Sequence, residues 1–221
     1  MGIVGAYQTD WKIMNINLYL NHYVDKNPTR QGEIEVCLKK NLSNPSFNVV
    51  LFESQSRVRY QDFFDFINKY SADDDINVIA NLDIYFDETI DLCRDMEKNS
   101  FYALSRWDVK KNRIVAHYAR AESQDVWVFK GKVNIKGDFF LGLRGCDNRI
   151  AYEAKMAGYN VFNPSHTIKA YHYHSSRIRN YSIRNKNDVV PGPYVVVPPC
   201  ALNSMNPSAA YVVGSSRRKR R

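Results

Sequence analysis

The sequence has few cysteines and no long hydrophobic run. Its four cysteines, Cys37, Cys93, Cys146 and Cys200, are scattered over 221 residues without CxxC spacing. We therefore expect reduced, mostly buried thiols in a reducing compartment. No run approaches transmembrane length, and the N-terminus lacks the apolar core of a signal peptide. These absences favour a cytoplasmic protein.

Several sequence signatures of enzymes are also absent. There is no GxGxxG, no Walker loop, no GxSxG and no HExxH. Their absence argues against the common dinucleotide-binding, P-loop, serine hydrolase and zinc peptidase classes. No internal repeat is present. Any chemistry must therefore come from a less familiar arrangement of side chains.

Positive charge is concentrated at the C-terminus. The formal net charge is +8, and the last five residues, Arg217 to Arg221, supply +5 of it, which leaves +3 for the rest. The mildly basic remainder suits an enzyme of anionic nucleotides and is weak evidence for a nucleic-acid module. The basic end could bind nucleic acid or anionic lipid headgroups, or act as a nuclear-type signal.

The order of apolar patterns predicts an α/β fold. Alternation from Met14 to Leu20 predicts a strand, and helical spacing follows over 30–42. A strand at 47–52, a helix at 60–70 and the buried strand at 78–80 continue the alternation. Strands at 101–107, 113–119 and 125–129 make the second half richer in strands. We expect a three-layer α/β/α fold with a central mixed, mainly parallel sheet.

The composition changes near residue 186. Five prolines, with glycine and serine, predict an irregular or mobile segment after that point, although Tyr194 to Val197 could pack as an edge strand. We therefore expect one catalytic-type domain over residues 1–185 and a Pro-rich, basic tail over 186–221.

Asp83 is the first candidate metal ligand. It follows the apolar run Val78-Ile79-Ala80, with the amide Asn81 two residues before it. In open α/β sheets, ligands bind beyond the carboxyl ends of strands. A carboxylate there suits Mg²⁺ or Mn²⁺ shared with substrate phosphates. The alternative is that Asn81 and Asp83 only cap or turn the chain.

Two further features carry candidate chemistry. His172 and His174 lie at i and i+2 on a predicted strand, so their side chains point the same way. They could ligate a metal, or one could be a surface residue and the other a hydrogen-bonded core residue. Asp147 stands at the start of a predicted helix, where a carboxylate can cap the free amides, and Gly158 is placed to end that helix.

Several segments are informative as an ordered set. They are Arg30-Gln-x-Glu, Glu53-Ser-x-x-Arg57, Asn81-Leu-Asp-Ile-Tyr-Phe-Asp, Ala103-Leu-Ser-Arg-Trp, Ser123-Gln-Asp-Val-Trp-Val-Phe, Gly142-x-x-Gly-Cys-Asp-Asn-Arg-Ile-Ala, Ala157-Gly-Tyr-x-Val-x-Asn-Pro-Ser and His172-Tyr-His-x-Ser-x-x-Arg-x-Tyr181. In this order they resemble a family of GT-A-type glycosyltransferases with members in bacteria and large algal viruses. The resemblance covers roughly residues 11 to 182.

The resemblance implies a GT-A (Rossmann-like) enzyme that moves a hexosyl or deoxyhexosyl group from a nucleotide diphosphate sugar, with UDP favoured, to a glycan or glycoprotein acceptor. It implies Mn²⁺ or Mg²⁺ at a DxD-like motif, completed by His172 or His174. Asn81 replaces the first acidic residue of that motif, so metal affinity could be lower or metal optional. No nucleic acid is expected, contact with a membrane is at most peripheral, and a viral protein would work in the host cytoplasm.

The resemblance also suggests roles for four other residues. Arg57 and Arg106 are candidates for binding donor phosphate or stacking on the base, with surface ion pairing as the alternative. Asp147 is the first candidate general base and Asp125 the second. Retaining and inverting chemistry both stay open. A non-catalytic domain that binds sugar nucleotides or glycans, and a nucleic-acid-binding protein, are the rival functions.

Overall fold

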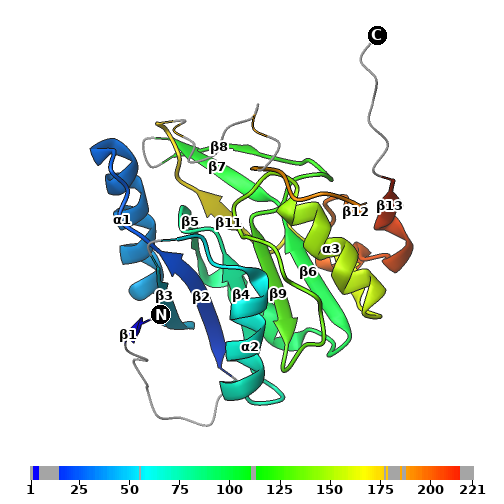
Figure 1. Ribbon diagram of the computed structural model, residues 1–221. Helices are drawn as coiled ribbons and strands as arrows, with labels where there is room; N and C mark the ends of the chain where they lie inside the picture. Colours follow the sequence, from blue (N-terminus) through cyan, green and yellow to red (C-terminus); the bar gives the residue numbers. More distant parts are fainter. Residues whose placement is uncertain are drawn as a thin grey trace.

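The computed structural model describes residues 2–4, 15–54, 56–110, 113–176, 178, 185 and 188–214 (Figure 1). Three α-helices lie among them: α1 (Pro28–Leu42), α2 (Tyr60–Tyr70) and α3 (Cys146–Met156). The short 3₁₀ helices are η1 (Glu88–Asp95), η3 (Leu202–Ser204) and η4 (Pro207–Ala209). None of the helices in this part of the chain is both long and apolar enough to cross a bilayer.

The largest sheet has seven strands in the order β1-β3-β2-β4-β9-β6-β10. These strands are β1 (Gly2–Val4), β2 (Ile16–His22), β3 (Phe47–Glu53), β4 (Ile76–Ala80), β6 (Ser100–Leu104), β9 (Val126–Lys130) and β10 (Asn160–Phe162). Only β1 and β9 run against the other five. The predicted central sheet, mixed and mainly parallel, is therefore confirmed.

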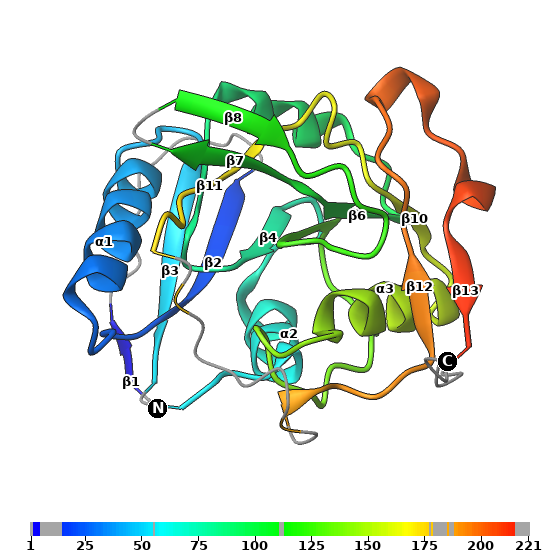
Figure 2. The ribbon, with the colours of Figure 1, turned by 90° about the horizontal axis from the view of Figure 1, so that it is seen from above.

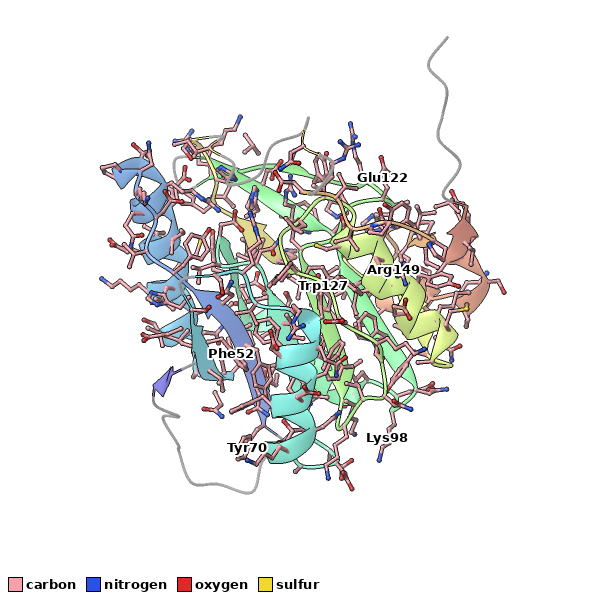
Figure 3. The ribbon with its side chains drawn as sticks, in the orientation of Figure 1. Phe52, Tyr70, Lys98, Glu122, Trp127 and Arg149 are labelled. Atoms are coloured by element: carbon pink, nitrogen blue, oxygen red, sulfur yellow. The ribbon has the colours of Figure 1, made fainter. Side chains whose placement is uncertain are left out.

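Both faces of this sheet are buried. Successive residues of a strand point to opposite faces. Tyr19 and Ile79 accordingly join α2 and α3 in one apolar core, whereas Leu18 and Val78 join α1 and η1 in another. Figures 1 and 2 show α2 and α3 together on one side of the sheet and α1 apart from them. In Figure 3, Phe52 and Trp127 lie inside, while Lys98 and Arg149 lie at the surface.

A four-stranded sheet, β5-β11-β7-β8, flanks the second core. It comprises β5 (Ile84–Phe86), β7 (Arg106–Lys110), β8 (Arg113–His117) and β11 (Ala170–His172). The strand predicted over 101–107 is wrong, because the chain changes sheets at Ser105. The amide N–H of Ser105 donates to Asn163 Oδ1 (2.9 Å) and its hydroxyl to the carbonyl of Ser123 (3.0 Å). These bonds replace the ladder bonds that a continuous strand would make.

The described part of the C-terminal segment packs on α3. β12 (Tyr194–Val196) pairs with β13 (Tyr211–Val213), so the expected strand forms, but in a separate two-stranded sheet. Val195, Val197 and Ala210 are buried in the same core as α2 and α3. Residues 215–221, with the basic run, lie outside the described residues.

Candidate metal centre

The candidate centre lies where the chain reverses its direction of travel across the sheet. From β2 the chain passes through α1 to β3 on one side, then through α2 to β4 on the other side of β2. α1 and α2 cover opposite faces of the sheet. Open α/β sheets bind their ligands at such a reversal, beyond the carboxyl ends of the strands, here β2 and β4. Asn27 caps α1, which follows β2, by accepting hydrogen bonds from the N–H groups of Thr29 (3.0 Å) and Arg30 (3.2 Å).

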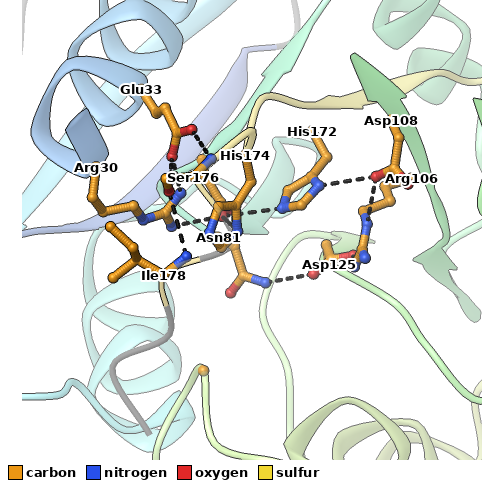
Figure 4. A network of polar contacts seen from close by, with 12 residues as sticks. Arg30, Glu33, Asn81, Arg106, Asp108, Asp125, His172, His174, Ser176 and Ile178 are labelled. Atoms are coloured by element: carbon orange, nitrogen blue, oxygen red, sulfur yellow. Dashed lines mark hydrogen bonds and ion pairs between the residues drawn. The ribbon is translucent and has the colours of Figure 1, made fainter. Parts of the chain in front are cut away.

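Asp83 is buried in the turn between β4 and β5, and its Oδ2 meets three basic side chains, Arg30, His172 and His174, which are labelled in Figure 4. Arg30 Nη2 lies 2.6 Å from that oxygen, His172 Nε2 3.2 Å and His174 Nδ1 3.5 Å. Burial opposes ionisation of Asp83, but the charges and hydrogen bonds of His172 and Arg30 outweigh it and lower its pKa below the usual range. Asp83 is therefore a carboxylate at any physiological pH.

Asp83, His172 and His174 could hold a metal ion. One potential ligand atom from each lies within 4.8 Å of the others. His174 Nε2 is buried, and no hydrogen-bond partner for it lies in the described part of the chain, which is unusual for a polar atom inside a protein. One carboxylate and two imidazoles suit a divalent transition metal. The residues present therefore fit a metal, and the structure brings together all three ligands predicted from the sequence.

Asp108 orients His172 from its other side. His172 Nδ1 lies 3.0 Å from Asp108 Oδ1, on the neighbouring strand β7. Burial lowers the pKa of His172, but Asp83 and Asp108 together raise it to about 9. A carboxylate behind a ligating histidine is a common feature of metal sites, because it fixes the tautomer and the ring orientation.

Asn81, Arg106 and Asp125 form a second group beside the first. Arg106 donates to Asp125 Oδ2 (2.8 Å) and to Asp108 Oδ1 (3.0 Å), and Asn81 Nδ2 donates to Asp125 Oδ1 (2.8 Å). Asn81 thus turns toward Asp125 rather than toward Asp83. The two groups meet at Asp108, so the contacts run without a gap from Asp83 through His172 to Asn81.

Asp147 occupies the first turn of α3, close to Asp125. Gly145 caps this helix with a left-handed backbone, φ 83°. Asp147 Oδ2 accepts a hydrogen bond from the N–H of Gln124 (3.4 Å). Burial raises the pKa of Asp147 to about 7, and the charge of Asp125 adds to this rise against hydrogen bonds from Asn148 and Gln124. Asp147 is thus a carboxyl group that exchanges its proton near neutral pH.

Arg57 contacts a different part of the molecule. It lies between β3 and α2, and its Nη1 donates to the carbonyl of Gly142 (3.2 Å), in the loop that leads to α3. The other predicted donor-binding arginine, Arg106, lies beside the centre, held between two carboxylates.

Four residues of the centre received no role from the sequence: Arg30, Glu33, Asp108 and Ser176. Glu33 accepts hydrogen bonds from the N–H (2.6 Å) and hydroxyl (2.8 Å) of Ser176, and it pairs with Arg30 (3.3 Å). Arg30 and Glu33 are three apart, so they share a helix face. Asp108 is two residues from Arg106 on one strand, so both side chains point the same way. The sequence shows both spacings, but it does not show which elements these side chains face.

No protein-family model matches the sequence, and the search of curated proteins gave no match either. Function therefore has to be inferred from the geometry of the centre itself.

Proposed function

We propose that this protein is a GT-A-type glycosyltransferase that transfers a sugar from a nucleotide diphosphate donor, with UDP favoured, to a glycan or glycoprotein acceptor. The observation that best supports this is the meeting of Asp83, His172 and His174 beyond the carboxyl end of β4. Open α/β sheets bind nucleotides beyond the carboxyl ends of their strands. A metal-ligand set there would hold the donor by its diphosphate.

The donor set favours Mn²⁺ over Mg²⁺. Mg²⁺ prefers oxygen ligands and keeps several waters, whereas two of the three candidate ligands here are imidazole nitrogens. When bound, the metal would neutralise charge on the diphosphate leaving group. Asp83 supplies the only carboxylate of the set among the described residues, which fits a weaker site than a motif with two acidic residues.

Asp147 is the better of the two candidate bases. Its pKa of about 7 allows it to accept a proton from an acceptor hydroxyl at neutral pH and to release it afterwards. Asp125 instead accepts hydrogen bonds from Arg106 and Asn81, so both of its oxygens already have partners. We therefore assign proton transfer to Asp147 and positioning of Arg106 and Asn81 to Asp125.

A non-catalytic domain that binds sugar nucleotides is the second candidate. The observation in its favour is Asn81, which stands at the first acidic position of the motif and is turned away from Asp83. Such a protein would bind the donor at the same place without consuming it.

The first test is a thermal-shift screen of UDP-, GDP- and dTDP-sugars with and without Mn²⁺, because a ligand that binds only the folded state raises the melting temperature. We expect UDP-sugars with Mn²⁺ to give the largest rise. Donor hydrolysis and transfer are then measured for wild type, Asp83→Ala and Asp74→Ala. Asp74 is an exposed aspartate near the opposite end of β4 and serves as the matched control.

We expect Asp83→Ala to lose turnover and metal dependence and Asp74→Ala to keep both. Donor binding without turnover in wild type would favour the non-catalytic function. Salt-sensitive binding of DNA or RNA that survives Asp83→Ala, with no response to any nucleotide sugar, would contradict both.

A further inference from the structure

Arg30 holds the oxygen that a metal ion would need. Its Nη2 is 2.6 Å from Asp83 Oδ2, closer than either imidazole, and the two side chains are 8% and 9% exposed. The histidine contacts end on the same oxygen. A divalent cation bound there would lie beside a guanidinium, and like charges at such distances repel strongly in a poorly hydrated site.

Glu33 offers Arg30 a second counter-ion. Arg30 Nη1 lies 3.3 Å from Glu33 Oε2, and the Glu33 side chain is 5% exposed. A buried arginine that lost its only carboxylate would be strongly destabilising. Because Glu33 stands one helical turn away on α1, Arg30 can leave Asp83 and still remain paired.

Glu33 also anchors the segment that follows His174. It accepts two hydrogen bonds from Ser176, which is two residues beyond that histidine. Figure 4 shows Glu33, Ser176 and Arg30 grouped on the α1 side of the centre. Glu33 is therefore in place whichever carboxylate Arg30 contacts.

From these contacts we infer that Arg30 competes with the divalent cation for Asp83, and that Glu33 receives Arg30 when the cation binds. This rests on the metal site of the proposed function. The affinity for metal would then depend on two neighbouring residues of α1, and removing the charge of one would change it in the opposite direction to removing the charge of the other. Removing the guanidinium tightens metal binding, whereas removing the Glu33 carboxylate leaves Arg30 with Asp83 alone and weakens it.

The test is a titration of the protein with Mn²⁺ alone, without nucleotide, in which isothermal calorimetry measures the binding. We expect Arg30→Gln to bind Mn²⁺ at least about tenfold more tightly than wild type and Glu33→Gln to bind at least about threefold more weakly. Two controls make the same charge changes elsewhere: Arg59→Gln, at an exposed ion pair, and Glu35→Gln, exposed on the same helix. Both should bind Mn²⁺ as wild type does.

Equal or weaker Mn²⁺ binding by Arg30→Gln would overturn the inference, as would the absence of Mn²⁺ binding in every variant. If Arg30→Gln does not fold, a crystal structure of the Mn²⁺-loaded wild type decides: Arg30 should contact Glu33 and no longer Asp83. An unbroken Arg30–Asp83 contact beside bound Mn²⁺ would refute competition. Donor turnover is measured separately, so a protein with no transferase activity can still show the opposite shifts in affinity.

Discussion

The two ends of β4 each bury a group of polar side chains, and the two groups differ in kind. At the amino end, Asn77 accepts hydrogen bonds from Tyr19 (3.1 Å) and Ser71 (2.9 Å) and donates to the carbonyl of Gly131 (2.9 Å). Asn17 donates to Asp75 (3.3 Å) in the same group. Apart from Asp75 these groups are neutral, and they bond to one another and to the backbone.

The carboxyl end gathers charged groups instead. Asp83 lies among three basic side chains, and His174 Nε2 has no partner among the described residues. Asn48, which donates to Asn17 in the amino-end group, likewise has a buried oxygen without a partner in the described part of the chain. A mostly neutral, hydrogen-bonded group stabilises a fold, whereas a cluster of buried charges is costly to fold and is typical of a functional site. The comparison teaches that polar burial and incomplete bonding alone do not locate a site, whereas a gathering of charge does.

Asp83→Asn should produce the largest effect and show most clearly that the two ends of β4 differ in their contribution to activity. In the proposed transferase, removing the charge should reduce kcat/KM by at least about 100-fold, because the site loses the carboxylate that would hold the metal against the diphosphate. At the other end, Asn77→Ala should cost about 1–3 kcal/mol of unfolding free energy by leaving buried hydroxyls unpaired, with kcat/KM of the folded protein unchanged. Urea unfolding and steady-state kinetics measure both. Loss of kcat/KM in folded Asn77→Ala would break the division.

The pH profile of Asp147 gives the next largest effect. If Asp147 is the base, as proposed, its pKa of about 7 means that it is protonated below neutrality, so kcat/KM should fall about tenfold per pH unit below pH 7. Asp147→Asn should lower kcat/KM by about 10² or more and remove this limb. A profile that is flat between pH 5 and pH 8 in wild type would exclude Asp147 as the base.

Asp147 should also weaken the fold that contains it. Its pKa is about 7 in the folded protein, compared with 3.8 for an unperturbed aspartate side chain, so the folded state binds the proton more tightly than the unfolded state does. Its contribution to stability is therefore lost as pH rises from about 4 to about 7. Asp147→Asn should be more stable than wild type at pH 8, by on the order of 1–3 kcal/mol. Equal stability at pH 8 would contradict the raised pKa.

Asp108→Ala tests the carboxylate behind His172. Without it the imidazole loses its fixed orientation, and Mn²⁺ affinity should fall by about 10–100-fold. Asp91→Ala removes another carboxylate paired with an arginine, Arg94, on η1, and should leave the affinity unchanged. Calorimetric titration of both variants measures the difference. Equal affinities would assign Asp108 to packing alone.

Tyr19→Phe should give the smallest effect. It removes one hydroxyl that bonds to Asn77 and Ser71, while Asn77 still accepts from Ser71. The expected loss is about 1 kcal/mol of unfolding free energy, with kcat/KM within about twofold of wild type. A loss above about 3 kcal/mol would show that the amino-end group is strongly cooperative.

Local patterns were enough to predict most elements of the first half. The helix expected over 60–70 and the buried strand after it form as α2 and β4, because their apolar periodicity matches the cores that they enter. The break at Ser105 could not be predicted in this way. Its cause is a pair of hydrogen bonds from Ser105 to Asn163 and Ser123, and neither residue is close to Ser105 in the sequence.

The centre was predictable where its residues lie near each other in sequence. Asp83 follows β4, and His172 is the last residue of β11, with His174 two residues beyond the strand. The apolar run before Asp83 and the i, i+2 spacing of the histidines were enough to nominate them. Arg30 and Glu33 lie on α1, which packs beside β5, and both side chains are buried, with Arg30 against Asp83 and Glu33 against Ser176. The sequence of the helix alone does not show that these charged residues are buried. Only the tertiary structure shows that Asp108 faces His172 from the next strand.

Asn163 connects the C-terminal segment to the strand that carries Asp108. Its amide donates to the Ser105 hydroxyl (2.8 Å) and to the carbonyl of Val197 (3.0 Å), while its oxygen holds the Ser105 N–H. β7, which carries Asp108, starts at the next residue. A chain that ends before Val195 would expose α3 and would lack the Val197 carbonyl that Asn163 binds. Loss of activity in such a truncated chain would therefore indicate a damaged scaffold rather than a missing catalytic group.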